Sequence, residues 1–133
     1  MSGTGNIGRV EAFVDAWNRR DGEAITAAFA DDAVYHNVPM APIVGNPAIS
    51  AAIVRLVSGM SDVAWEIVHI AEGRNGTVLT ERVDALRMAD RSVSLPLMGV
   101  FEFRCGLITR WADYFDLGQY QAQLAGNVAG GLA

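Results

Sequence analysis

Apolar residues in the first half of the chain recur three and four positions apart, the spacing of one face of an α-helix. Three such stripes predict three helices that pack into the core. The first ends near Arg19-Arg20, the second follows Asp21-Gly22, and the third begins at Asn46-Pro47, an N-cap followed by proline. The stripes consist of Val10, Phe13, Val14 and Trp17, then Ile25, Ala28 and Phe29, then Ile49, Ala52, Ile53, Leu56 and Val57.

Alternation of apolar and polar residues replaces the helical pattern after Asp62 and predicts β-strands. Tight turns separate four of them, and a shorter strand lies between the second and third helices, followed by a loop. Pro96 cannot donate a ladder hydrogen bond, so its strand should form an edge or a bulge there. The expected strands are Ala33–Val38, 62–70, Thr77–Met88, Ser92–Arg104 and Leu107–Phe115, with a closing helix over Leu117–Leu124.

The order of these elements, helices first and then strands in sequence, indicates an α+β domain with a mixed, strongly curved β-sheet. Helices packed over such a sheet give a cone with one deep pocket. The length of 133 residues favours a single domain over the whole chain, 1–133. Its ends, 1–8 and 126–133, are glycine-rich and are expected to be flexible.

Composition narrows the range of partners. The net charge of -5 argues against binding to nucleic acid or to an anionic membrane surface. Hydrophobic residues make up 51% of the chain, which is rich for a small monomer, so a homodimer is expected. Cys105 is a single cysteine, and neither a signal peptide nor an apolar run of about 20 residues is visible, so we expect a cytoplasmic protein.

The strand Thr77–Met88 carries a mixed set of side chains on one face. Residues two apart share a face, so Arg82 and Asp84 lie side by side, next to Thr80 and Leu86. A guanidinium and a carboxylate among apolar neighbours indicate either a structural salt bridge or ionisable groups that point into an apolar pocket.

The last strand repeats this arrangement, because Asp113 stands between Trp111 and Phe115 on one face. On the short strand, Tyr35 and Asn37 share a face as well. With Arg82 and Asp84, the candidate set contains two carboxylates, one arginine, one phenol and one amide. Such a set can carry out proton transfer on a small, mostly apolar molecule.

Other kinds of site are not indicated. No serine or cysteine nucleophile stands beside a base in this set, and no glycine-rich phosphate loop is present. His36 and His69 are isolated and lack metal-ligand spacing, so both are expected to be structural. We therefore expect neither a metal nor another cofactor.

Five segments carry a family resemblance: Tyr35-x-Asn37, TERVDALR from Thr80 to Arg87, LMGVF from Leu97 to Phe101, Ile108-Thr109, and WADYFD from Trp111 to Asp116. Together they resemble the limonene-1,2-epoxide hydrolase family, which belongs to the NTF2-like, SnoaL-like superfamily of cone-shaped α+β folds. The resemblance runs from about Ala33 to Gln119, in order and with similar spacing.

The resemblance implies an epoxide hydrolase that adds water to an apolar epoxide and gives a vicinal diol, without a covalent intermediate. It implies that Asp113 is the general base, Asp84 the general acid, and Arg82 the bridge between them, while Tyr35 and Asn37 help to hold the water. The physics is consistent with these roles. Two adjacent carboxylates in a low dielectric do not both ionise readily, so one keeps a proton, and arginine stabilises the remaining charge.

The pocket itself is expected to be lined by Leu95, Leu97, Trp111 and Phe115, which suit a terpene-like or cycloalkene oxide; ordinary core residues are the alternative for each. Two other functions remain open. A ketosteroid-isomerase-like enzyme also uses an aspartate base and a tyrosine donor, but needs no arginine between two aspartates. A non-catalytic ligand-binding protein has little reason to bury two carboxylates and an arginine together.

Overall fold

Four helices, six strands and one short 3-10 turn make up the computed structural model, which describes residues 5–126. The helices are α1 (Asn6–Asn18), α2 (Gly22–Ala27), α3 (Asn46–Ser58) and α4 (Leu117–Leu124), and the turn is η1 (Arg74–Gly76). The strands are β1 (Phe29–Asn37), β2 (Ile43–Val44), β3 (Met60–Glu72), β4 (Val78–Met88), β5 (Arg91–Arg104) and β6 (Leu107–Tyr114).

The strands form one mixed sheet in the order β2-β1-β6-β5-β4-β3. Neighbouring strands are antiparallel except β1 and β6, which run parallel. This parallel pair sets Tyr35 opposite Trp111 and Asn37 opposite Asp113, although about 76 positions separate their strands along the chain (111 minus 35 and 113 minus 37). The polar residues of the short early strand are thereby brought beside those of the last strand.

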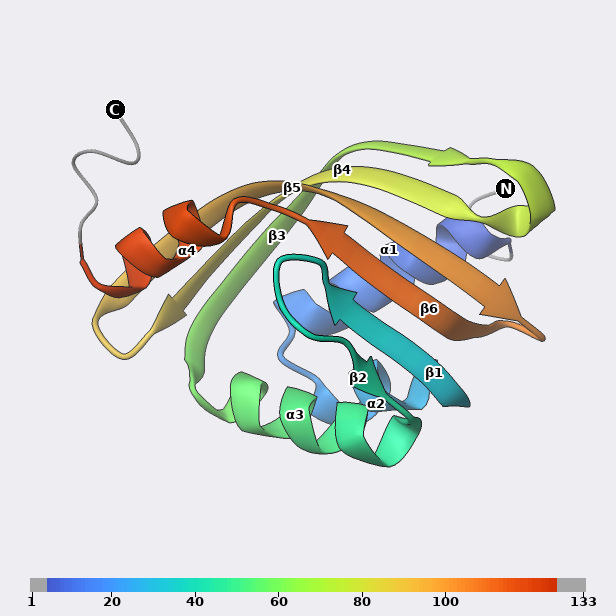
Figure 1. The fold of residues 1–133 in the computed structure, drawn as a ribbon, viewed down its shortest axis with the longest axis horizontal. Coiled ribbons are helices and arrows are strands. Elements are labelled where there is room, and N and C mark those ends of the chain that lie inside the picture. Colours follow the sequence, from blue (N-terminus) through green and yellow to red (C-terminus); the bar gives the residue numbers. More distant parts are fainter. Residues whose placement is uncertain (1–4, 127–133) are drawn as a thin grey trace.

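The sheet curves over α1, α2 and α3, and α4 lies at the end of β5 that is remote from α1 (Figure 1). The buried stripe of α1 explains this packing. Phe13 makes edge-on ring contacts with Trp17, Phe29, Phe101 and Trp111, at centroid distances from 4.9 to 6.4 Å. The main core is therefore an aromatic cluster between α1 and the concave face of the sheet.

The predicted α+β class, the curved mixed sheet and the three early helices are confirmed. The expected extent of the second helix is wrong, because α2 ends at Ala27 and Phe29 begins β1, where it pairs with Ile108. The expected loop after Val38 contains the two-residue β2. Asn46 is the first residue of α3 and does not cap it; its side-chain amide instead donates to the carbonyl of Phe29.

The expectation of a flexible segment over 1–8 is wrong for Asn6 to Gly8, which form the first turn of α1. Residues 1–4 and 127–133 lie outside the described residues, and Gly126 hydrogen-bonds to the carbonyl of Gln123. Within residues 5–126, no helix is both long enough and apolar enough to cross a membrane.

Pro96 marks the point at which β5 changes from an interior strand to an edge strand. The ladder with β6 runs only from Met98 to Arg104, whereas the ladder with β4 continues past Pro96, which lies opposite Val83. The local edge expected from the proline is confirmed, and the register shift of β5 against β6 lies elsewhere, between Glu102 and Phe103. This uncovered half of β5 is the part against which α4 packs.

Candidate active site

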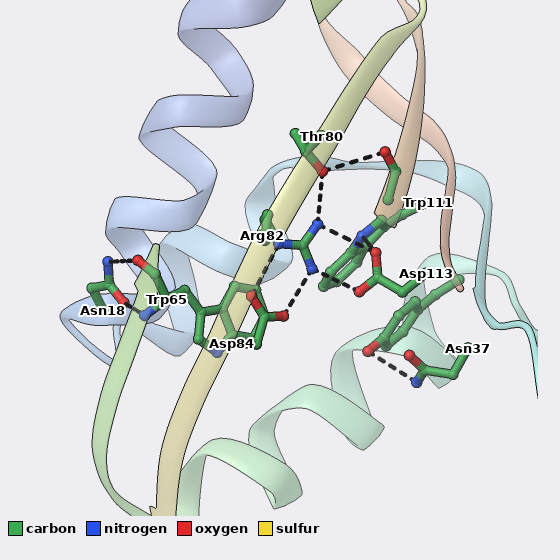
Figure 2. A network of polar contacts seen from close by, with 10 residues as sticks. Asn18, Asn37, Trp65, Thr80, Arg82, Asp84, Trp111 and Asp113 are labelled. Carbon is green, nitrogen blue, oxygen red and sulfur yellow. Dashed lines mark hydrogen bonds and ion pairs between the residues drawn. The ribbon is translucent and has the colours of Figure 1, made fainter. Parts of the chain in front are cut away.

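Arg82 lies on β4, between β5 and the edge strand β3, and is completely buried. Its Nε and Nη2 donate to the two oxygens of Asp84 at 3.1 and 2.8 Å, and its Nη1 and Nη2 donate to the two oxygens of Asp113 at 3.3 and 2.8 Å. Nη1 also donates to Thr80 Oγ1 at 3.1 Å. These five bonds match the five N–H donors of a guanidinium, so Arg82 bridges both carboxylates and no donor is left over (Figure 2).

The two carboxylates are not equivalent. Asp113 Oδ1 accepts from Arg82 Nη1 and also from Trp111 Nε1, the latter at 2.8 Å. These two bonds use both acceptor positions of Oδ1. Among residues 5–126, Asp113 Oδ2 accepts only from Arg82 Nη2, which leaves one of its acceptor positions free within this part of the chain. Asp84 receives two hydrogen bonds where Asp113 receives three. Because donors stabilise the ionised form, Asp113 is the better placed of the two to carry the negative charge.

Aromatic rings and a glycine enclose this ion cluster. The guanidinium carbon of Arg82 lies 5.2 Å from the ring centroid of Trp65, 5.8 Å from Phe101 and 5.9 Å from Trp111. A Cβ atom added at Gly99 would lie 2.5 Å from both Arg82 Nη1 and Asp113 Oδ1. Gly99 is therefore required for the close approach of β5 to the arginine and its carboxylate partner.

Tyr35 and Asn37 project from β1 toward the same cavity. Asn37 Nδ2 donates to Tyr35 Oη at 3.1 Å, and the Tyr35 ring stacks on Trp111 at 4.3 Å between centroids. Tyr35 Oη thus acts as an acceptor toward Asn37 and keeps its own O–H for a further partner, as Asn37 keeps its carbonyl oxygen. The pair presents one donor and one acceptor beside Asp113, whose β6 position is opposite Asn37.

Burial governs the protonation of the cluster. Burial raises the pKa of Asp84 from its ordinary 3.8 to about 6, against the opposing hydrogen bonds and charge of Arg82, and the charge of Asp113 adds to the rise. Burial also raises the pKa of Asp113. Burial alone would lower the pKa of Arg82, but the two carboxylates outweigh it, so the guanidinium stays charged. Burial and the charge of Asp113 raise the pKa of Tyr35, which keeps the phenol neutral.

The cavity that these groups face has a volume of about 90 Å³ and is mainly apolar. Asp84, Asp113, Tyr35 and Asn37 lie on its wall, whereas Arg82 lies behind the two carboxylates. Leu95, Leu97 and Phe115 also lie on this wall. Trp111 lies behind this wall: it is completely buried, it stacks on Tyr35, and its Nε1 donates to Asp113.

Several wall residues were not anticipated from the sequence. The wall also includes Trp65, because β3 pairs with β4 in a register that sets it opposite Asp84. That register has no local signal in the chain. Thr80 lies outside the wall, where it bonds to Arg82, and it could have been found, since it lies two residues before Arg82 on the same strand face. The other unanticipated members of the wall are Trp17, Met40, Leu56, Met60, Leu86, Val93 and Tyr120.

The two histidines lie apart from the cluster. His36 contacts the carbonyl oxygen of Met40 at 2.9 Å, and His69 contacts Glu81 at 2.8 Å on an exposed part of the sheet. Among residues 5–126, no three His, Cys, Asp or Glu side chains are grouped so that they could hold a metal ion. The carboxylates of this site can transfer protons, and its phenol and amide can form hydrogen bonds.

Comparison with known proteins gives concordant results. A family model described as the SnoaL-like domain matches residues 10–111. The chain is 38% identical over 122 residues to epoxide hydrolase EphG of Mycobacterium tuberculosis (strain ATCC 25618 / H37Rv), covering 90% of this chain and 80% of that protein.

Solved structures extend the likeness to three dimensions. An LEH-like epoxide hydrolase from M. tuberculosis superimposes with a TM-score of 0.79 at 37% identity, covering 93% of this chain and 92% of that one. A protein of ketosteroid isomerase-like fold from Catenulispora acidiphila DSM 44928 superimposes with a TM-score of 0.75 at 24% identity, covering 86% and 90% of the two chains. The second likeness shows a shared fold only.

Proposed function

Because the chain belongs to the SnoaL-like domain family, in the branch that contains the limonene-1,2-epoxide hydrolase-like proteins, we propose that it is an epoxide hydrolase. The observation that carries the proposal is the buried arginine that bridges two carboxylates on the wall of an apolar cavity. Such a bridge keeps a proton acceptor and a proton donor a few ångströms apart on one surface. Opening an epoxide with water needs both at once, since water is a weak nucleophile and the alkoxide is a poor leaving group.

Asp113 is the base in this proposal, and Oδ2 is its reactive atom because Oδ2 has the free acceptor position. A water molecule bound there donates one hydrogen to Asp113 Oδ2 and the other to the free carbonyl oxygen of Asn37. The hydroxyl of Tyr35 donates to one lone pair of that water. The second lone pair is then directed at the epoxide carbon, and the water attacks it without a covalent enzyme intermediate.

Asp84 is the acid. Burial raises the pKa of both carboxyl groups, so burial does not select between them. Asp84 accepts two hydrogen bonds and Asp113 accepts three, so we assign the proton to Asp84. As the carbon–oxygen bond of the epoxide breaks, Asp84 gives this proton to the ring oxygen, and Asp113 takes one from the water. The total charge of the cluster is unchanged, so Arg82 stabilises it equally before and after the reaction.

The substrate is an apolar epoxide of the size of a cycloalkene oxide or a small terpene oxide. The apolar wall formed by Leu95, Leu97 and Phe115 supports this class. The cavity volume of about 90 Å³ favours the smaller cyclic epoxides of this class.

The alternative of a ketosteroid-isomerase-like reaction has weaker support. That reaction would use one aspartate base and the Tyr35 hydroxyl. The second carboxylate and Arg82 would then have no role in catalysis. A non-catalytic binding role is also weaker, because an ion cluster buried among aromatic rings costs desolvation energy that an apolar lining avoids.

The experiment that tests the proposal is diol formation from a panel of cyclic epoxides, followed by a single turnover with enzyme in excess in ¹⁸O-water. Direct attack places the label in the diol of the first turnover. An ester route would instead give unlabelled diol and leave the label in the peptide that contains Asp113. Failure to form diol from any epoxide would overturn the proposed function, whereas unlabelled diol would overturn only the mechanism.

We also propose that two copies of the chain associate through the outer face of the sheet. Met98 lies opposite Tyr114 in the ladder of β5 and β6, and Leu79 lies on the adjoining strand opposite Val100. The exposed fractions are 50% for Met98, 48% for Tyr114 and 43% for Leu79, so an apolar area is open to solvent. Sedimentation at micromolar concentration should give twice the mass of 14.2 kDa, and Met98→Glu should shift it to the monomer.

A further inference from the structure

Thr80 is the uncharged partner of Arg82, and its hydroxyl has a fixed orientation. Thr80 Oγ1 donates to the carbonyl oxygen of Gly99 at 3.3 Å, and it accepts from Arg82 Nη1 at 3.1 Å. A hydroxyl has one hydrogen, so the bond to Gly99 turns the oxygen lone pairs toward the guanidinium. Thr80 is 1% exposed, and it is not part of the cavity wall.

The bond to Thr80 affects how Arg82 shares its charge. Nη2 reaches both carboxylates at 2.8 Å, but Nη1 reaches Asp113 Oδ1 only at 3.3 Å while it is held by Thr80 on its other side. Without the hydroxyl, one N–H of a buried cation would have no acceptor, and such a group costs free energy. The guanidinium would therefore shift, and Nη1 would move toward Asp113, the remaining acceptor within its reach.

We propose that Thr80 is a positioning residue for the reaction: its hydroxyl holds Arg82 Nη1 back from Asp113 and thereby keeps Asp113 basic enough to deprotonate water. The inference rests on the proposed function, since it concerns the base of that reaction. The titratable or charged groups that face Asp113 are Arg82 and Asp84 on β4 and Tyr35 on β1. Of these, Arg82 is the group in direct contact with Thr80.

The test is Thr80→Val, which keeps the shape of the side chain and removes the hydroxyl. We expect kcat to fall about tenfold, the change in rate that the loss of one hydrogen bond to a charged group can produce. KM should stay the same because Thr80 does not line the cavity. The acidic limb of the rate profile should move to lower pH, and ¹³C NMR of the Asp113 carboxyl should give a lower pKa than in the unmodified protein.

Matched variants separate positioning from general stability. Thr80→Ser keeps the hydroxyl and should restore most of the rate and the original titration. Thr109→Val removes a hydroxyl that bonds only to the carbonyl oxygen of Glu102, and it should change neither. If Thr80→Val does not fold, Thr80→Cys takes its place, because a thiol is a weak acceptor of similar size.

The proposal is overturned if the Thr80 variant retains its rate, or if the rate falls while the titration of Asp113 does not move. A fall in melting temperature without that shift would indicate a structural role only. The NMR titration does not depend on turnover, so it tests Thr80 even if no epoxide in the panel is hydrolysed. In that case the proposed function fails and the coupling of Thr80 to Asp113 is judged separately.

Discussion

The cavity has two ends that are held together in different ways. At the polar end, formed by Thr80, Arg82, Asp84 and Asp113, each N–H of the guanidinium has an acceptor and three aromatic rings surround it. At the α4 end, Phe115 and Tyr120 pack on a small separate cluster of Val93, Leu95 and Leu97. The polar end lies in the middle of the sheet, and the α4 end lies on an uncovered strand edge.

Gln123 of α4 adds hydrogen bonds to that edge. Gln123 is 1% exposed, its Oε1 accepts from the Ser94 N–H at 2.6 Å, and its Nε2 donates to the Ser94 carbonyl oxygen at 3.1 Å. The amide thus takes the place of a neighbouring strand where β6 has ended. From this contrast we expect a division of tasks: the polar end should hold catalytic geometry within narrow limits, and the α4 end, which has fewer polar contacts, should influence the size of the substrate.

The largest expected effect is the loss of the base. Asp113→Asn removes the proton acceptor while it keeps the size of the side chain, so turnover should fall by about a hundredfold to ten-thousandfold. Asp90→Asn, which changes an exposed carboxylate in the turn between β4 and β5, is the control and should have no effect. The measurement is the turnover rate of both variants on the epoxide that the panel identifies. Nearly full activity in the Asp113 variant would show that another residue is the base.

The next effect tests how tightly the polar end is packed. In Gly99→Ala the new methyl group would overlap Arg82 and Asp113, so turnover should fall about a hundredfold and unfolding should be easier by about 1 to 3 kcal/mol. Gly22→Ala is the matched control, because an added Cβ there meets no atom within 4 Å. Denaturant unfolding and turnover rates are measured on both variants. A fully active Gly99→Ala would mean that Arg82 and Asp113 can move to accommodate the methyl group without loss of function.

The pH dependence sharpens the same contrast through Asp84. A general acid must carry its proton, and the pKa of Asp84 is about 6, so kcat/KM should fall about tenfold for each pH unit well above 6. Asp84→Asn should lose both the activity and this alkaline limb. A rate profile that stays flat from pH 6 to pH 9 would show that Asp84 does not act as the acid.

Stability should depend on Asp84 in the same pH range. Its pKa is raised on folding from 3.8 to about 6, so the unfolded chain releases this proton at a lower pH than the folded protein does. The contribution of Asp84 to stability is therefore greatest below pH 4 and is lost as the pH rises to about 6. Burial also raises the pKa of Asp113, so both the unmodified protein and Asp84→Asn should lose stability as the pH rises. Urea unfolding at pH 4 and pH 7 should show a larger loss in the unmodified protein, and equal pH dependence in both would exclude a contribution from Asp84.

The contrast between the two ends also separates what the sequence predicts from what it does not. The sequence predicts which polar side chains share a strand face, because alternate residues of a strand point to the same side. This applies to Tyr35, Asn37, Arg82, Asp84 and Asp113. The role of Trp111 was not predictable, since side-chain contacts behind a wall depend on how β1 and β6 pair. The register that sets Trp65 opposite Asp84 likewise arises from pairing at a distance, and local spacing cannot reveal it.

The α4 end was the less predictable part, for a physical reason. Pro96 signalled an edge in β5, but nothing local indicated that the amide of Gln123 would complete that edge. Such a contact joins residues 29 positions apart and involves one side chain and one backbone unit, so it produces no periodic pattern. The short β2 was missed in the same way, because two residues are too few to show alternation.

The smallest effect is expected at Gln123, and it should concern selectivity and not chemistry. Gln123→Ala removes both hydrogen bonds to Ser94, and because Ser94 is exposed, water can replace them at a cost of about 1 kcal/mol in stability. The polar end is unchanged, so kcat for a small cyclic epoxide should stay within about twofold. We expect α4 to open more readily, so that kcat/KM for larger epoxides rises relative to that for small ones.

Gln121→Ala, on the exposed face of the same helix, is the matched control and should leave this ratio of kcat/KM values unchanged. The measurement is the ratio of kcat/KM for a large and a small epoxide in each protein; a ratio that does not rise in Gln123→Ala, or an equal fall in kcat for both substrates, would mean that α4 is as rigid a part of the site as Arg82.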